Sequence, residues 1–284
     1  MLLLKYQYAE GVNLYSIISL IKNDDVSFNH TILENAGADR YSAHLHDRCE
    51  IIYLVRGEMT YTAEGRSYEL KNGDIVISKP YILHNIYPTR ETTYERYDII
   101  IDHKRLQNEL WQKIKSGRDV YKCAGNDLIY EMFTKMDYYY GKFSDENYTR
   151  LVNNIAEEIL YNLSLMEGED GGSVNPIIDK ALSYIRENLK ELKSVDEICD
   201  ALYITKGHLH HLFVQHIKMT PMKYVTSKRL LLARRMIRRG KRPTEVFTDC
   251  GFNDYATFFR NYKAYFGYSP SEEGEKSALL DILS

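Results

Sequence analysis

An acidic, glycine-rich stretch at residues 167–175, EGEDGGSVN, divides the chain into two parts with different residue patterns. The stretch has no apolar periodicity, and its composition is typical of a flexible linker. With 284 residues, the chain has the length of two ordinary domains. We therefore expect one domain over residues 1–170 and a second over residues 174–284.

The charge of the whole chain hides a difference between these two parts. A formal net charge of -3 and a pI of about 6.3 argue, taken alone, against a nucleic-acid partner. Residues 1–173, however, carry 19 basic and 27 acidic side chains, whereas residues 174–284 carry 18 and 13. Within residues 206–263 there are 13 basic side chains and 3 acidic ones. This asymmetry predicts that only the C-terminal part contacts nucleic acid.

Cysteine usage and the first residues indicate the cellular compartment. The four cysteines lie far apart without a C-x-x-C pair, which argues against a disulfide framework or a thiolate zinc site and fits a reducing cytosol. The first residues, MLLLKYQYAEG, lack the basic and apolar regions of a secretory signal. The apolar stretch over 12–21 is too short to cross a bilayer. We expect a cytoplasmic protein.

The N-terminal part changes character near residue 104. Before it, short runs rich in β-branched and aromatic residues alternate with turn residues, which predicts a small β-barrel over about residues 28–103. After it, apolar residues recur every three to four positions, which predicts helices over 105–166. The last helix carries an apolar stripe from Leu151 to Met166, which either covers the barrel or joins two copies of the chain.

The C-terminal part predicts only short helices and one long one. Pro176 fits the first turn of the first helix, and Ser194 with Glu197 forms a capping box for the next. Two similar units, over 194–217 and 243–267, each combine a short helix, a turn and a second helix. The predicted class is therefore α+β, with a β-barrel domain followed by an all-α domain of two helix-turn-helix units.

The C-terminal part resembles the AraC/XylS family of bacterial transcription regulators over about 100 residues in matching order. The family's DNA-binding domain has two helix-turn-helix units joined by a long helix, so the resemblance implies binding to double-stranded promoter DNA. The residues that carry it are Arg229, Leu230, Ala233, Gly251, Phe252, Phe258, Arg260, Tyr262, Lys263, Gly267, Ser269 and Pro270.

Several positions depart from the family pattern. His210-His211 stands where the family usually has a polar residue followed by arginine. Pro243 replaces an aliphatic residue, and Phe247 replaces a small alanine. The acidic pair Glu272-Glu273 replaces the arginine that usually ends the last motif. These departures bear on which bases are contacted and leave the expected fold intact.

The resemblance places the second helix of each unit in the major groove. The base-facing candidates are Gly207, His210 and His211 in the first unit, and Tyr255, Ala256, Phe259 and Arg260 in the second. Phosphate contacts are expected from Lys206, Arg229, Arg234, Arg235 and Lys263. An alternative for the histidines at 208, 210, 211 and 216 is a zinc site, although no cysteine lies nearby.

The N-terminal part contains a second family pattern, His44-x-His46-x3-Glu50-x6-Gly57, followed by His84. The pattern resembles the two motifs of the cupin barrel, the second without its usual internal glycine. Residues 44 and 46 point the same way on a strand, and imidazoles with a carboxylate suit a divalent ion. The resemblance implies that the four side chains either hold zinc, nickel, manganese or iron, or hydrogen-bond a ligand or each other without a metal.

We expect these four side chains to line a pocket in the barrel that binds a small polar effector. Its predicted lining adds three tyrosines to the motif, and a carbohydrate is the effector that family analogy favours. The leading interpretation is a homodimeric transcription regulator that is not an enzyme and needs no cofactor. The alternatives are a metal-dependent cupin enzyme with a DNA-binding tail, or a module that docks on an acidic protein. The predicted effector-binding residues are His44, His46, Glu50, Tyr53, Tyr61, Tyr81 and His84.

Overall fold

The chain forms two compact units in the computed structural model. Unit 1 comprises residues 1–44 and 48–172, and unit 2 comprises residues 173–284 together with the short segment 45–47. Asp170 and Ser173 of the expected linker lie outside the described residues. The structure describes residues 4–6, 15–23, 25–37, 43–169, 171–172 and 174–273.

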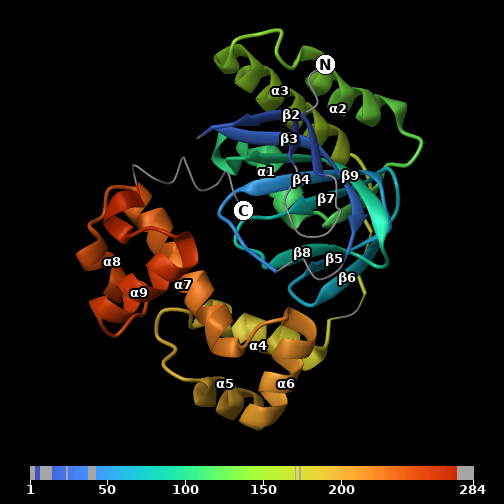
Figure 1. Cartoon of the computed structure of the whole chain (residues 1–284). Coiled ribbons are helices and arrows are strands. Elements are labelled where there is room, and N and C mark those ends of the chain that lie inside the picture. The colour runs from blue at the N-terminus through green and yellow to red at the C-terminus, as the bar shows by residue number, and fades with distance from the viewer. Residues whose placement is uncertain are drawn as a thin grey trace. The chain divides into compact units, whose positions relative to one another are not determined.

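The larger sheet of unit 1 has seven strands in the order β1-β2-β3-β9-β4-β7-β10 (Figure 1). All paired neighbours are antiparallel. The two faces of an antiparallel sheet can have different neighbours, so one face can pack in the barrel and the other against helices. Its strands are β1 Leu4–Tyr6, β2 Tyr15–Lys22, β3 Val26–Ala36, β4 Cys49–Arg56, β7 Asp74–Ser78, β9 Thr92–Ile101 and β10 Val120–Lys122.

A smaller sheet closes the barrel on the other face. Its order is β6-β5-β8, from β5 Met59–Ala63, β6 Arg66–Leu70 and β8 His84–Pro88. Because side chains alternate along a strand, Ile52 and Leu54 of β4 enter the barrel core with Tyr61, whereas Cys49, Ile51 and Tyr53 face the opposite way. This alternation decides which side chains can reach an internal site.

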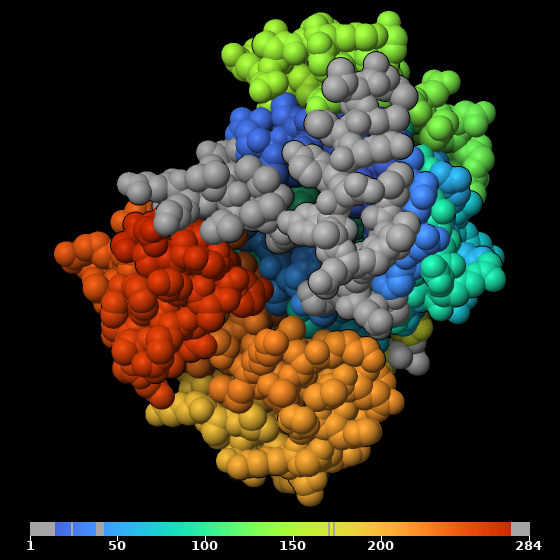
Figure 2. Space-filling model, viewed as in Figure 1, coloured from blue at the N-terminus to red at the C-terminus, as the bar shows by residue number. Residues whose placement is uncertain are grey.

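Helices cover the outer face of the larger sheet. The apolar stripe of α3 is buried against this sheet and against α2, so it serves the core of unit 1. Figure 1 shows α2 and α3 beside the larger sheet, and Figure 2 shows the same green residues on the outside of unit 1. Of the two roles expected for the stripe, covering the barrel is therefore the one observed. These elements are η2 His103–Arg105, α1 Asn108–Ser116, α2 Asp127–Tyr139 and α3 Asp145–Leu163.

One strand interrupts the segment expected to be helical over 105–166. Strand β10 pairs with β7, with Val120 opposite Val76. Three residues are too few to show an alternating pattern, so the surrounding helical periodicity concealed the strand. It forms the edge of the larger sheet.

The described residues 174–273 of unit 2 form helices joined by short connections and contain no strand. Each pair of short helices packs on the long helix α7, and the second pair encloses a core of Leu230, Phe258 and Tyr262. The sheet-rich first unit and helical second unit confirm the predicted α+β class. Among the described residues, no helix is long and apolar enough to cross a membrane. The elements are α4 Pro176–Glu187, α5 Val195–Leu202, α6 Lys206–Ile217, α7 Pro221–Arg238, α8 Pro243–Asp249, α9 Tyr255–Phe266 and η3 Pro270–Glu272.

Candidate functional site

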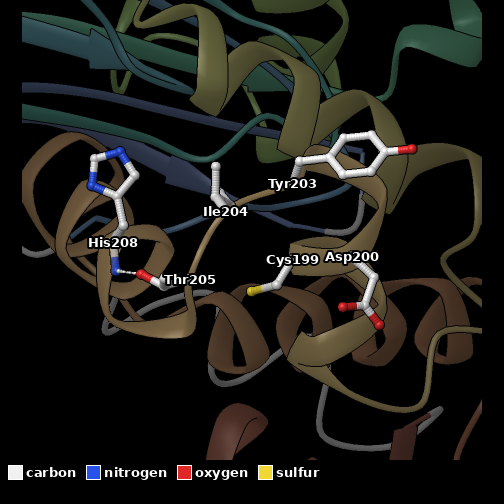
Figure 3. Close-up of a pocket in the computed structure, with 6 residues that line it drawn as sticks. All are labelled: Cys199, Asp200, Tyr203, Ile204, Thr205 and His208. Carbon is white, nitrogen blue, oxygen red and sulfur yellow. Dashed lines mark hydrogen bonds between the residues drawn. The ribbon is translucent and has the colours of Figure 1, made fainter.

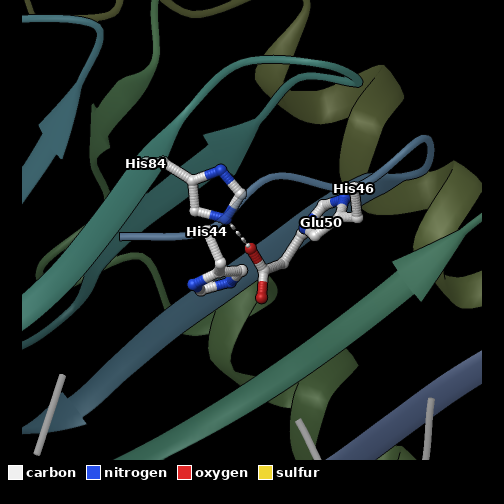
Figure 4. Close-up of side chains that lie close together, drawn as sticks. All are labelled: His44, His46, Glu50 and His84. Atoms are coloured by element: carbon white, nitrogen blue, oxygen red, sulfur yellow. Dashed lines mark ion pairs between the residues drawn. The ribbon is translucent and has the colours of Figure 1, made fainter. Parts of the chain in front are cut away.

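Four side chains of the cupin-like pattern come together at the barrel. His44, His46, Glu50 and His84 each offer a ligand atom, and these atoms all lie within 4.8 Å of one another (Figure 4). Glu50 and His84 are buried, His46 is half-buried and His44 is exposed, so the cluster opens to solvent on one side. Although 45–47 is grouped with unit 2, His46 is two residues from His44 and from Arg48, and the covalent chain keeps it beside them.

The backbone holds the cluster in register. His44 and His84 form an antiparallel bridge, with N–H···O distances of 3.0 and 2.9 Å. The Nδ1 of His84 lies 2.8 Å from the carbonyl of Ile82, to which it donates, and its Nε2 lies 3.0 Å from Oε2 of Glu50. A histidine whose Nδ1–H bonds a backbone carbonyl presents Nε2 to the site, an arrangement usual for metal-ligating histidines.

The predicted tyrosines do not all face this cluster. Tyr61 is fully buried in the barrel core, bonds Ser78 at 3.2 Å, and has its ring centre 6.3 Å from that of His84. Tyr81 is half-buried in the β7–β8 connection with φ +65°. Tyr53 is a correction: it stacks on Phe133 of α2 at 4.8 Å, on the opposite face of β4 from Glu50.

The first helix-turn-helix unit forms from strong local signals. The capping box at Ser194 and Glu197 is present, and Thr205 accepts a 3.2 Å hydrogen bond from the His208 N–H at the start of α6 (Figure 3). A shallow hollow lies between α5 and α6, and the exposed side chain of Tyr203 stands at its rim. Lys206, at the first turn of α6, forms a 2.8 Å ion pair with Asp196.

The second unit is built in the same way. Asp254 caps α9 by accepting a 2.7 Å hydrogen bond from the Thr257 N–H, and hydrogen bonds from Thr257 lower the pKa of that carboxyl. Pro243 stands in the first turn of α8, as expected for a helix N-terminus. Phe247 packs edge-on against Tyr255 at 5.8 Å, which accommodates the ring that replaces a small residue.

Most predicted DNA contacts are accessible. Exposed or half-buried side chains, or backbone in the case of Gly207, occur at Lys206, Gly207, His210, His211, Arg235, Tyr255, Ala256, Phe259, Arg260 and Lys263. Arg229 and Arg234 are exceptions because both are buried. The Arg229 Nε donates to the carbonyl of Leu189 at 2.8 Å, so we assign it to joining α4 and α7. The burial of Arg229 and Arg234 argues against the phosphate contacts that we expected from these two side chains.

The acidic pair that departs from the family pattern has a structural explanation. Glu273 is almost fully buried, and its Oε1 accepts hydrogen bonds from Nε of Arg234 at 2.9 Å and Nε of Arg238 at 2.7 Å. Its Oε2 accepts a hydrogen bond from Tyr262. One acidic side chain therefore compensates a buried arginine, which removes Arg234 from the charges available to DNA.

A second buried polar cluster was missed in the sequence. Asp137 of α2 accepts hydrogen bonds from Ser19, His30 and Tyr97, the last two at 2.7 Å, and His30 also lies 3.3 Å from Glu95. Burial would raise the pKa of Asp137, but the hydrogen bonds outweigh it and lower that pKa below 3.8. The cluster ties α2 to the sheet. A lone histidine in a strand carries no signal that would have identified it.

The histidines of α6 do not form a metal site. Among the described residues, the barrel cluster is the group of metal-ligating side chains that gathers closely, and the α6 histidines form none. His208, His210 and His211 are exposed along the helix. They remain candidates for contact with DNA.

Two family models match the chain, one to each unit. A model described as an AraC-like ligand binding domain matches residues 31–163, and a helix-turn-helix domain model matches residues 198–275. The first therefore includes the cluster at the barrel, and the second includes both helix pairs and the long helix between them.

Curated relatives match over both units. The lactose operon transcription activator of Staphylococcus xylosus is 21% identical over 87% of this chain and 86% of its own length. The transcriptional activator RhaR of Escherichia coli K12 is 22% identical over 90% of this chain and 95% of its own length. The XylDLEGF operon transcriptional activator 2 of Pseudomonas putida is 26% identical over 45% of this chain and 82% of its own length.

Proposed function

The chain belongs to the AraC family of transcription regulators, and from this premise we propose that it is a cytoplasmic, homodimeric regulator without enzymatic activity. Its helical unit binds promoter DNA, and its barrel unit binds a small-molecule effector that controls that binding. The observation that carries the proposal is the pairing of two capped helix-turn-helix units with a polar, solvent-open cluster in the barrel. An effector acts here only if it binds one state of the protein more tightly than another.

DNA binding is tested with the full chain and the DNA upstream of its own coding region. Fluorescence anisotropy at several salt concentrations should show an affinity that falls as salt rises, with a slope of about -0.9 per phosphate contact. An unrelated duplex of the same length is the control. Binding without salt dependence, or none to any promoter fragment, would contradict the proposal.

We propose a carbohydrate as the effector. The cluster combines a carboxylate with imidazoles at an open mouth, and these groups suit hydroxyl ligands. One relative is an activator of a lactose operon, which supports the same chemical class. A thermal-shift screen over sugars should find one that raises the melting temperature, since a ligand of the folded state stabilises it.

Matched variants locate that ligand. Glu50→Gln should abolish the shift because it removes the charged acceptor of the cluster. Tyr53→Phe should keep it, because that ring packs on the far face of β4. A sugar that still stabilises Glu50→Gln to the same extent binds elsewhere.

We also propose that the cluster is able to hold one divalent ion. Three imidazoles and a carboxylate are a suitable donor set, and His84 already has the backbone partner that orients a ligating ring. Elemental analysis of the purified chain should find about one ion per chain in the wild type and none in His84→Asn. An ion retained in both is bound elsewhere.

Self-association is tested by sedimentation velocity of the full chain. A concentration-independent species of twice the chain mass supports the homodimer. A monomer at concentrations where DNA binding saturates would contradict it.

A further inference from the structure

The segment that follows α3 does not leave the barrel at once. Glu169 bridges to Val120 at the outer edge of β10, with its N–H donating to the Val120 carbonyl at 2.7 Å. Its carboxylate forms a 2.9 Å ion pair with Lys122 on the same strand. Further along, the Gly172 N–H lies 3.4 Å from the carbonyl of Ser67 on β6. We call the described residues 167–169 and 171–172 the strap.

The strap touches an edge of each sheet. Strand β10 ends the larger sheet and β6 ends the smaller one, so each has one row of backbone groups without a strand neighbour. Such edges pair readily with another extended segment. Tyr68 of β6 also joins the two edges, because its hydroxyl donates to Asp119, just before β10, at 3.0 Å.

Glycine lets the strap approach this closely. A Cβ at Gly171 would lie 2.4 Å from Cζ of Tyr68, and one at Gly168 would lie 2.3 Å from Cβ of Arg118. The Tyr68 ring cannot easily retreat, because it is buried and its hydroxyl is held by Asp119. A Cβ at Gly172, in contrast, would meet nothing closer than 3.9 Å.

Buried aromatic rings connect the strap to the His44–His46–Glu50–His84 cluster, which we call the effector cluster. The Tyr68 ring centre lies 5.8 Å from that of Tyr61, which in turn lies 6.3 Å from that of His84. All three side chains are almost fully buried, so a shift of His84 would be passed to Tyr68 by direct packing. Tyr68 is the side chain that lies beneath Gly171.

We propose that the strap sets the free length of the tether between the two units, and that the state of the His44–His46–Glu50–His84 cluster controls its docking. With the strap docked, three Cα-to-Cα steps lead from Gly172 to the cap of α4 at Asn175, a reach of about 10 Å. Release back to Met166 leaves nine such steps, a reach of about 30 Å. A longer tether changes how the DNA-binding unit is presented. This inference rests on the proposed function.

Proteolysis of the full chain tests docking. An endoprotease that cuts after glutamate reaches Glu169 only when the strap is released, so the cleavage rate follows the released fraction. Gly171→Ala should be cut after Glu169 about tenfold faster than Gly172→Ala, because the added methyl overlaps a fixed ring in the first variant alone. Gly168→Ala should behave like Gly171→Ala. Equal rates in all three variants overturn docking.

Coupling to the cluster is tested by the same cleavage. Glu50→Gln keeps the shape of the side chain but removes its charge, and should change the rate after Glu169 at least threefold in the wild-type background and not in Gly171→Ala. Cleavage after Glu64, in the β5–β6 turn, reports any general loosening of the barrel. An unchanged rate in Glu50→Gln overturns the coupling.

DNA binding distinguishes this inference from the proposed function. Gly171→Ala should retain the salt-dependent affinity of the helical unit for DNA. If no form of the chain binds DNA, the proposed function fails while the cleavage results stand. If DNA binding is intact but Gly171→Ala and Gly172→Ala are cut equally fast, only the strap inference fails.

Discussion

Glu273 offers a direct test of how unit 2 holds its last described residues. Its carboxylate accepts hydrogen bonds from Arg234, Arg238 and Tyr262, and burial together with this carboxylate raises the pKa of Tyr262 far above its usual range. Glu273→Ala removes this carboxylate from both guanidinium groups, and Arg238 keeps its 3.7 Å ion pair with Asp47. The Arg238 side chain is 26% exposed and can be solvated, whereas that of Arg234 is only 7% exposed and cannot.

The expected cost follows from that difference. Removing one member of a buried ion pair costs about 3–5 kcal/mol, so we assign this cost to the pair with Arg234 and little to the pair with Arg238. In a helical unit of about 100 residues, each kcal/mol lowers the melting temperature by about 4–8 °C, so Glu273→Ala should lower it by at least about 12 °C. Replacing both partners, as in Glu273→Ala with Arg234→Met, should recover much of the loss because no buried charge is left.

Scanning calorimetry of the full chain measures this effect as a shift of the transition of unit 2 relative to that of unit 1. Glu245→Ala is the matched control, because it also removes a carboxylate from an arginine, in the exposed pair with Arg242, and should leave the transition unchanged. A Glu273→Ala chain that melts within about 2 °C of the wild type would refute the assignment of this carboxylate to the buried charge of Arg234.

Two further predictions use other charged groups. Because the pKa of Asp137 is lowered in the folded state, its ionised form stabilises the fold above pH 3.8, and this contribution is lost as the pH falls through the folded pKa. Urea unfolding should therefore show Asp137→Asn to be less stable than the wild type at pH 7. The difference in free energy of unfolding should shrink below about pH 4. Lys206→Gln should reduce the salt slope of DNA binding, measured by anisotropy, by about one. Arg229→Lys should leave that slope unchanged and lower the melting temperature measured by calorimetry, because Arg229 is held by backbone carbonyl groups.

Helix boundaries were predictable because each depends on a few neighbouring residues. The capping box at Ser194 and the proline start at Pro176 both occur as the sequence indicates. Such caps satisfy backbone N–H groups within one turn, so they need no information from distant parts of the chain. The apolar cores of both helix pairs follow in the same way from periodicity, as at Phe213 and Phe258.

Side-chain destinations were less predictable where they depend on distant contacts. Arg229 and Arg234 belong to a basic run, and charge alone does not distinguish a buried arginine from a phosphate contact. The error at Tyr53 was avoidable, because it stands three positions after Glu50 and an odd spacing puts the two on opposite faces of a strand. Asp137 could not be anticipated, since its partners lie on three other elements.

The glycine-rich stretch between the units shows what composition can and cannot predict. Composition indicates how much conformational entropy a segment loses on ordering, but it does not indicate where the segment lies in the fold. Glycine and acidic residues make ordering such a segment costly, so the stretch was expected to be free. The same lack of side chains is what permits Gly171 to lie on the Tyr68 ring and Gly168 on Arg118. Close approach recovers part of the entropic cost through an edge hydrogen bond and the Lys122 pair. Because few contacts hold the segment, its proposed release requires only a small change in free energy at the His44–His46–Glu50–His84 cluster.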